Sequence, residues 1–164
     1  MATLSITPVS QISPENDLVT CEIFIGAPRE RVFDALTDPK QAVRWWGQND
    51  RYHLTNFRID PRVGGKWSTS GGSAKMGDID VHGELLELDP PRRLSYTWIS
   101  SWLPKTTKVV WELEEHKNGT LVRLTHTGFE GNAEQANAHS IGWNLILVWL
   151  QAYAERGETV ENRK

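Results

Sequence analysis

Two histidines and one tyrosine are the side chains of this sequence best suited to proton transfer. Tyr96 and His126 fall on the predicted inward faces of two strands, and His139 falls on the apolar face of a predicted helix. An imidazole can take up or release a proton near neutral pH, so these residues are the candidate acid/base or ligand-orienting groups. The more common alternative is a core histidine held by hydrogen bonds.

Eight tryptophans are spread singly or in pairs over nearly every predicted element. They are Trp45, Trp46, Trp67, Trp98, Trp102, Trp111, Trp143 and Trp149. Indole is large, flat and carries one N–H donor, so many indoles are hard to fit into a close-packed core without gaps or unpaired donors. The spread favours a lined cavity, and the alternative is that the rings fill one large core.

Other catalytic and binding motifs are missing from the sequence. The glycine pairs Gly64-Gly65 and Gly71-Gly72 lack the spacing and the Lys-Ser/Thr of a phosphate loop. No His, Asp or Glu spacing matches a metal site, and the single cysteine, Cys21, excludes an internal disulfide and a cysteine-rich metal site. We therefore expect neither a metal nor a cofactor.

The composition is that of a single globular domain. The chain has 164 residues, of which 38% are hydrophobic and 24% are charged, and no linker or repeat divides it. The net charge of −3 comes without a basic stripe, which argues against a nucleic-acid partner. No apolar run is long enough to span a membrane, and the N-terminal residues do not resemble a signal peptide, so we expect a cytoplasmic protein.

The order of the predicted elements indicates an α+β architecture. A strand over 18–25 precedes two short helices over 29–37 and 40–46. Six strands follow, over 54–60, 66–70, 78–88, 93–101, 106–115 and 120–127, and a long helix over 133–156 ends the pattern. Strands joined by short turns form an antiparallel sheet, which we expect to curve around the long helix. We predict one domain over 17–157, an N-terminal extension over 1–16 and a flexible charged tail over 158–164.

The long helix carries two apolar stripes. The stripe assigned to the sheet consists of Ala136, His139, Trp143, Ile146, Leu150 and Ala154. The second stripe consists of Ile141, Leu145, Val148 and Ala152. Either the N-terminal segment or a second copy of the chain, in a homodimer, is expected to cover it.

Several segments of the sequence together resemble a known family. They are Ala27–Pro39, Trp45-Trp46, Asp60–Trp67, Gly83–Leu94, Thr125–Phe129 and Gly142-Trp143. They are similar to the bacterial relatives of the activator of the heat-shock-protein-90 ATPase, within the START-like and polyketide-cyclase superfamily. The resemblance implies a helix-grip fold with an elongated apolar cavity between sheet and helix. Many members of the superfamily bind hydrophobic small molecules, and a few catalyse cyclisation or hydration.

The inward faces of the predicted elements supply the candidate binding residues. They are Phe33, Trp46, Trp67, Thr69, Tyr96, Trp98, Trp111, Leu124, His126, His139, Trp143, Ile146 and Leu150. An apolar volume with few polar groups is typical of a small-molecule pocket, so we predict binding of a hydrophobic, aromatic or polycyclic ligand. One alternative is an enzyme of the cyclase or hydratase type with a histidine acid/base. A weaker alternative is a chaperone-interacting domain, which is disfavoured because the chain lacks the separate chaperone-binding N-terminal domain of the eukaryotic activator.

Overall fold

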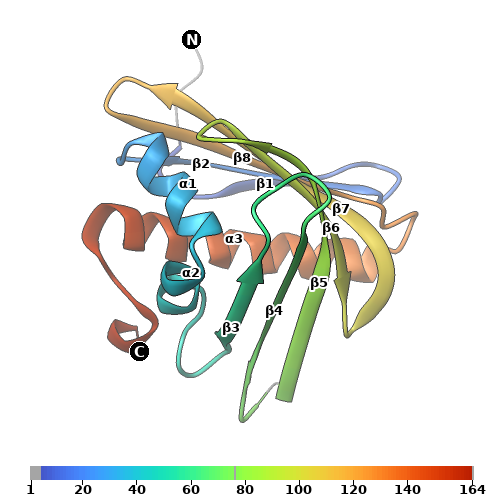
Figure 1. The fold of residues 1–164 in the computed structure, drawn as a ribbon. Coiled ribbons are helices and arrows are strands. Elements are labelled where there is room, and N and C mark those ends of the chain that lie inside the picture. Colours follow the sequence, from blue (N-terminus) through green and yellow to red (C-terminus); the bar gives the residue numbers. More distant parts are fainter. Residues whose placement is uncertain (1–4, 76, 164) are drawn as a thin grey trace.

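The computed structural model describes residues 5–75 and 77–163, which form one antiparallel sheet around a long C-terminal helix (Figure 1). The strands are β1 (Val9–Ile12), β2 (Leu18–Ile25), β3 (His53–Ile59), β4 (Lys66–Ser73), β5 (Gly77–Asp89), β6 (Arg93–Ser100), β7 (Leu103–His116) and β8 (Gly119–Thr127). The helices are α1 (Arg29–Thr37), α2 (Pro39–Trp45) and α3 (Ala133–Arg156), and a 3₁₀ turn, η1, spans Val160–Asn162. The predicted α+β helix-grip fold is confirmed.

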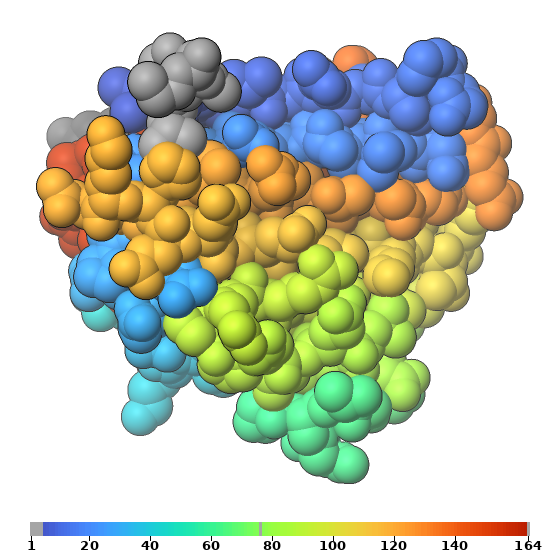
Figure 2. Space-filling view, turned by 90° about the horizontal axis from the view of Figure 1, so that it is seen from above, coloured from blue at the N-terminus to red at the C-terminus, as the bar shows by residue number. Residues whose placement is uncertain are grey.

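The eight strands are ordered β1-β2-β8-β7-β6-β5-β4-β3 in the sheet. Figure 2 shows the outer face of the sheet, where the blue N-terminal strands lie beside orange β8 although the two segments are far apart in sequence. Buried and less buried residues alternate along β2, as expected for a strand with one face on the core. None of the helices among the described residues is long and apolar enough to cross a membrane.

The N-terminal residues contribute a strand that the sequence analysis did not predict. Residues Val9–Ile12 pair antiparallel with β2, with Val9 opposite Glu22 and Ile12 opposite Val19. We expected an extension over 1–16, whereas β1 belongs to the sheet of the domain; residues 1–4 lie outside the described residues. A four-residue strand is too short for its alternation to stand out in a sequence.

The caps and the main apolar stripe of α3 agree with the prediction. The Asn132 side chain accepts a hydrogen bond from the Gln135 backbone N–H at 3.1 Å, and Gly157 adopts the left-handed conformation that ends many helices. All six residues of the stripe assigned to the sheet are buried. In the second stripe Ala152 is buried and Leu145 is partly buried, but Ile141 and Val148 remain 56% and 41% exposed.

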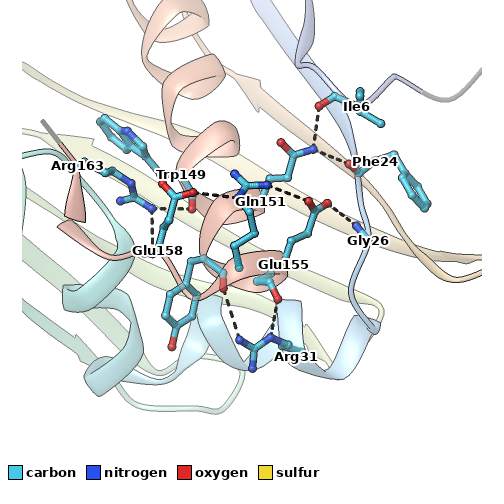
Figure 3. A network of polar contacts seen from close by, with 12 residues as sticks. Ile6, Phe24, Gly26, Arg31, Trp149, Gln151, Glu155, Glu158 and Arg163 are labelled. Carbon is cyan, nitrogen blue, oxygen red and sulfur yellow. Dashed lines mark hydrogen bonds and ion pairs between the residues drawn. The ribbon is translucent and has the colours of Figure 1, made fainter. Parts of the chain in front are cut away.

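The N-terminal segment contacts a neighbouring side of α3, which leaves Ile141 and Val148 uncovered. Ser10 is bonded through its hydroxyl to Ser140 and Asn144. Nearer the C-terminal end of α3, the side-chain amide of Gln151 donates to the backbone carbonyls of Ile6 and Phe24, as Figure 3 shows. These contacts follow a polar row of the helix, which lies beside the second apolar stripe. The homodimer that would cover the stripe stays a prediction.

The C-terminal residues, which we expected to form a flexible tail, return to the body of the protein. After η1, the Arg163 side chain is only 8% exposed and donates to the backbone carbonyls of Trp45, Gly47 and Trp149. Figure 3 shows the guanidinium group directed at α3. The last carbonyls of a helix have no partner within the helix, and a planar guanidinium can satisfy several at once. Arg163 therefore joins the end of α2 to α3.

Replacing Arg163 with Ala should lower the free energy of unfolding by about 2–4 kcal/mol, because several buried carbonyls lose their donor together. Denaturant titration of the two proteins measures the change. Arg156→Ala is the control, since Arg156 is exposed and pairs only with Glu155 and Glu158, and its loss should cost about 0.5 kcal/mol or less. Equal effects of the two substitutions would show that the tail does not stabilise the fold.

Candidate functional site

A cavity of about 580 Å³ lies between α3 and the part of the sheet formed by β3–β6. Its walls are made by Trp46, Tyr52, Leu54, Thr69, Ser70, Asp78, Ile79, Val81, Trp98, Ser101, Trp102, Ala138, His139, Gly142, Trp143 and Ile146. The volume falls in the range of pockets that hold small molecules. Four of its lining residues, Asp78, Ser101, Trp102 and Ala138, are exposed, so the cavity is open to solvent on their side.

The structure brings together about half of the predicted binding residues. Those that line the cavity are Trp46, Thr69, Trp98, His139, Trp143 and Ile146. Those that are buried away from the cavity are Phe33, Trp67, Tyr96, Trp111, Leu124, His126 and Leu150. Both sets face inward, as predicted from alternation and helical spacing. The second set fills the part of the molecule where sheet and helix are in contact.

Other lining residues were not among the predicted ones. Tyr52 and Trp102 lie outside regular elements or at their ends, where no periodicity indicates a direction. Ala138 and Gly142 are one helical turn apart on α3, beside His139. Two small residues at this spacing leave space next to one face of a helix. The pair is visible in the sequence and could have indicated that the cavity lies beside this face.

His126 is fully buried and both of its ring nitrogens are engaged. Nδ1 is 3.0 Å from the indole nitrogen of Trp143, which can only donate, so Nδ1 accepts. The neutral ring then carries its proton on Nε2, which lies 2.7 Å from the Thr107 hydroxyl, and that hydroxyl donates to the Trp98 carbonyl at 2.8 Å. Burial, and next to it the neighbouring His139, holds the pKa of His126 well below its ordinary value. His126 is therefore a neutral structural group with no free nitrogen for acid/base chemistry.

Tyr96 is also committed to the core. Its hydroxyl accepts a hydrogen bond from the Trp111 indole at 2.9 Å, and burial raises the pKa of the phenol. Neither Tyr96 nor His126 lines the cavity. The three candidate acid/base groups thus do not meet in one enclosed volume.

His139 is the histidine that reaches the cavity wall. Its Nδ1 lies 2.8 Å from the Gln135 carbonyl oxygen and must donate to it, which leaves the lone pair on Nε2. Nε2 is buried and has no hydrogen-bond partner among residues 5–75 and 77–163. Burial lowers the pKa of His139, against the smaller opposing effect of the Gln135 hydrogen bond. A neutral ring with one unused acceptor therefore lies in the wall.

Two further polar groups of the wall complete its chemistry. The indole nitrogen of Trp98 is a buried donor that has no partner in the described part of the chain. The Tyr52 hydroxyl accepts from the Trp46 indole at 3.3 Å, and burial raises the pKa of Tyr52 to about 12, so this phenol is neutral. The wall is largely aromatic, with Thr69, Ser70, Asp78 and Ser101 as further polar residues. Among the described residues, its buried polar atoms without a partner are one donor, on Trp98, and one acceptor, on His139.

Metal and thiol chemistry find no support in the described part of the chain. Within residues 5–75 and 77–163, no three His, Cys, Asp or Glu side chains form a group that could hold a metal ion. Cys21 is buried in β2, where burial raises the pKa of its thiol to about 12. A thiol with so high a pKa is not a nucleophile at neutral pH.

The fold defines a helix-grip protein, and its cavity opens between the sheet and α3. The chain belongs to the family described as activator of Hsp90 ATPase homolog 1-like protein, whose model matches residues 26–155. The predicted family is confirmed. No match was found among curated proteins.

Solved structures with the same fold come from several bacteria. Protein Ms6760 from Mycobacterium smegmatis is 18% identical, with a TM-score of 0.77 over 90% of this chain and 96% of that one. The AHSA1-like protein from Aeromonas hydrophila is 25% identical, with a TM-score of 0.68 over 83% and 90%. CalU16 from Micromonospora echinospora is 24% identical, with a TM-score of 0.66 over 92% and 85%. These likenesses establish the fold.

Trp143 should be the most sensitive position of this site for stability. Trp143→Ala should lower the free energy of unfolding by about 3–5 kcal/mol, as for other large buried aromatic residues. Trp143→Phe should cost about 1–3 kcal/mol, because it leaves Nδ1 of His126 without a donor. Trp102→Phe, at a ring that is 42% exposed, is the matched control and should cost less than about 1 kcal/mol. Denaturation midpoints that do not differ among the three would contradict the burial of Trp143.

The two buried histidines should make the protein sensitive to acid. Their pKa values are lowered in the folded state, so the unfolded chain binds more protons once the pH falls below about 6.5. The free energy of unfolding is therefore highest above that pH, where both histidines are neutral in the folded and the unfolded protein. It decreases as the pH falls toward the lowered pKa values of the folded protein. The slope should be up to about 1.4 kcal/mol per pH unit for each histidine.

Denaturant titrations between neutral and mildly acidic pH test this dependence. His139→Phe should reduce the slope, because one titrating group is removed. His82→Asn, at an exposed position of β5, serves as the control substitution. An unchanged slope in His139→Phe would contradict the proton linkage of that residue.

Proposed function

We propose that this protein binds a hydrophobic aromatic small molecule in the cavity between β3–β6 and α3. The observation that supports this most is the wall itself, in which Trp46, Trp98, Trp102 and Trp143 surround about 580 Å³ of space. The cavity is partly open to solvent, and a concave, mostly aromatic surface of this size is typical of small-molecule sites, which supports the proposal.

The arrangement of the indoles favours a flat ligand. The ring centroid of Trp143 lies 6.2 Å from that of Trp46 at an angle of 60° between the planes, and 5.1 Å from that of Trp98 at 54°. Rings held at such angles offer both faces and edges to a guest, and aromatic pairs prefer edge-to-face or offset contacts. An aromatic or polycyclic ligand can use both kinds of contact.

Binding has more support than catalysis. Acid/base catalysis needs a positioned titratable pair, and of the three candidates only His139 lines the cavity. The hydrogen bonds of His126 and Tyr96 are internal to the core. A chaperone-interacting role would rest on the exposed side chains of Ile141 and Val148, which are a small surface for a stable complex.

Gly142 offers a direct test of the cavity. A Cβ atom added at Gly142 would meet no atom within 4 Å, so a larger side chain can enter the cavity without moving the backbone. Glycine also disfavours helix, so Gly142→Leu should not destabilise α3. Calorimetric titration with 2-methoxynaphthalene, a neutral aromatic probe, should give one saturable site of micromolar affinity in the wild type. Gly142→Leu should weaken that affinity at least about tenfold by filling the space.

Asn137→Leu is the matched control for this experiment. Asn137 is an exposed residue of the same helix that does not line the cavity, and it receives the same side chain. Its affinity for the probe should equal that of the wild type. Unsaturable binding to the wild type, or equal affinity of the wild type and Gly142→Leu, would remove the cavity as the binding site.

A further inference from the structure

We infer that the ligand of this cavity is uncharged and carries a hydroxyl group, which donates to Nε2 of His139 and accepts from the indole N–H of Trp98. This inference rests on the proposed function and adds the polar part of the ligand to it. Both nitrogens belong to residues of the cavity wall and have no partner among the described residues. Both are buried beneath the surface of the wall, so the hydroxyl group reaches them only when neighbouring side chains give way. A hydroxyl group is the simplest chemical group that both donates and accepts.

The orientation of the His139 ring fixes which chemistry it can offer. The hydrogen bond from Nδ1 to the Gln135 carbonyl lies within α3, one helical turn back, so the ring cannot present its N–H to the cavity without losing that bond. The Nε2 side is then an acceptor in a residue that is only 6% exposed. A buried acceptor without a donor is costly, which gives a ligand that supplies an O–H a clear advantage over one that does not.

Trp98 supplies the matching donor at short range. Its ring centroid lies 6.4 Å from that of His139, with the planes at 75°. The two rings are therefore neighbours in the wall, and the inference requires that one hydroxyl group contact the nitrogens of both. The other indoles of the deep wall already have partners, since Trp46 donates to Tyr52 and Trp143 donates to His126. Trp98 is thus the indole of that deep wall left to bind a ligand oxygen.

The charges around the cavity disfavour an anionic ligand. Asp78 is the carboxylate among the described lining residues, and none of them is Lys or Arg. The titratable groups that face the same part of the molecule as His139 include His126, at 5.0 Å between ring centroids, and Asp78 and Tyr52 of the same wall. His126 is neutral, and a carboxylate ligand would require a proton on His139, which burial opposes. A phenol, enol or alcohol meets no such cost.

Three probes with the same ring system separate these alternatives. 2-Naphthol has an O–H donor and an oxygen acceptor, 2-methoxynaphthalene keeps the oxygen but lacks the donor, and 2-naphthoate is an anion. In calorimetric titrations at pH 7.5, 2-naphthol should bind about tenfold tighter than 2-methoxynaphthalene, the effect expected when a buried acceptor gains its donor. 2-Naphthoate should bind most weakly.

Variants assign the difference to the two nitrogens. In His139→Phe the preference for 2-naphthol over 2-methoxynaphthalene should vanish, while the affinity for the ether stays within about twofold. His139→Gln keeps an acceptor oxygen and should therefore retain part of the preference for 2-naphthol. This variant tests the same point if His139→Phe folds poorly. Trp98→Phe should weaken 2-naphthol and the ether alike, because both use the same donor.

The ¹⁵N resonances of the histidines give a readout independent of affinity. On addition of 2-naphthol, Nε2 of His139 should shift upfield as its lone pair accepts a proton donor, and 2-methoxynaphthalene should leave it in place. Nδ1 of His126, which already accepts from Trp143, is the internal control. If 2-naphthol and the ether bind equally and His139 does not shift, the hydroxyl inference fails and the proposed cavity stands. If none of the three probes binds, the proposed function fails and the inference with it.

Discussion

A buried series of hydrogen bonds connects the centre of α3 to three strands of the sheet. It runs from the indole of Trp143 on α3 through His126 on β8 and Thr107 on β7 to the backbone carbonyl of Trp98 on β6. The Trp143 indole can only donate and the Trp98 carbonyl can only accept, so the direction of the bonds between them fixes the neutral form and the tautomer of His126. A polar chain in so apolar a core is stable only when every member is satisfied, and here every member is.

This series of hydrogen bonds lies between two parts of the interior that differ in their packing. On one side, Trp111, Leu124 and Leu150 bring α3 into direct contact with the sheet, and all three are fully buried. On the other side, the strands β3–β5 diverge from the helix and small residues of α3 leave the cavity open. Trp143 takes part in the hydrogen-bond series and also lines the cavity. The position of this part of the wall therefore depends on the bond from Trp143 to His126. A rigid wall lowers the entropic cost of binding a ligand.

The two histidines show how environment decides the role of one residue type. They lie 5.0 Å apart, and burial lowers the pKa of both. His126 uses both nitrogens to hold elements together, whereas His139 uses one and leaves the other unpaired at the cavity. An unsatisfied buried polar group costs free energy, and a ligand that pairs with it removes that cost. The same reasoning applies to the indole of Trp98.

The sequence by itself determined the family, the strand order along the chain, the caps of α3 and the inward face of each element, because alternation, helical spacing and turn residues are local properties. It could not separate the cavity wall from the core. Trp67, Tyr96 and Trp111 have the same inward pattern as Trp98, yet Trp98 alone of these four lines the cavity. It also missed β1 and the anchor at Arg163, whose partners lie more than a hundred residues away in Trp45 and Gly47. Only the tertiary structure decided these points, since the distance between sheet and helix at each residue, and the partner of each buried polar atom, depend on the packing of the whole chain.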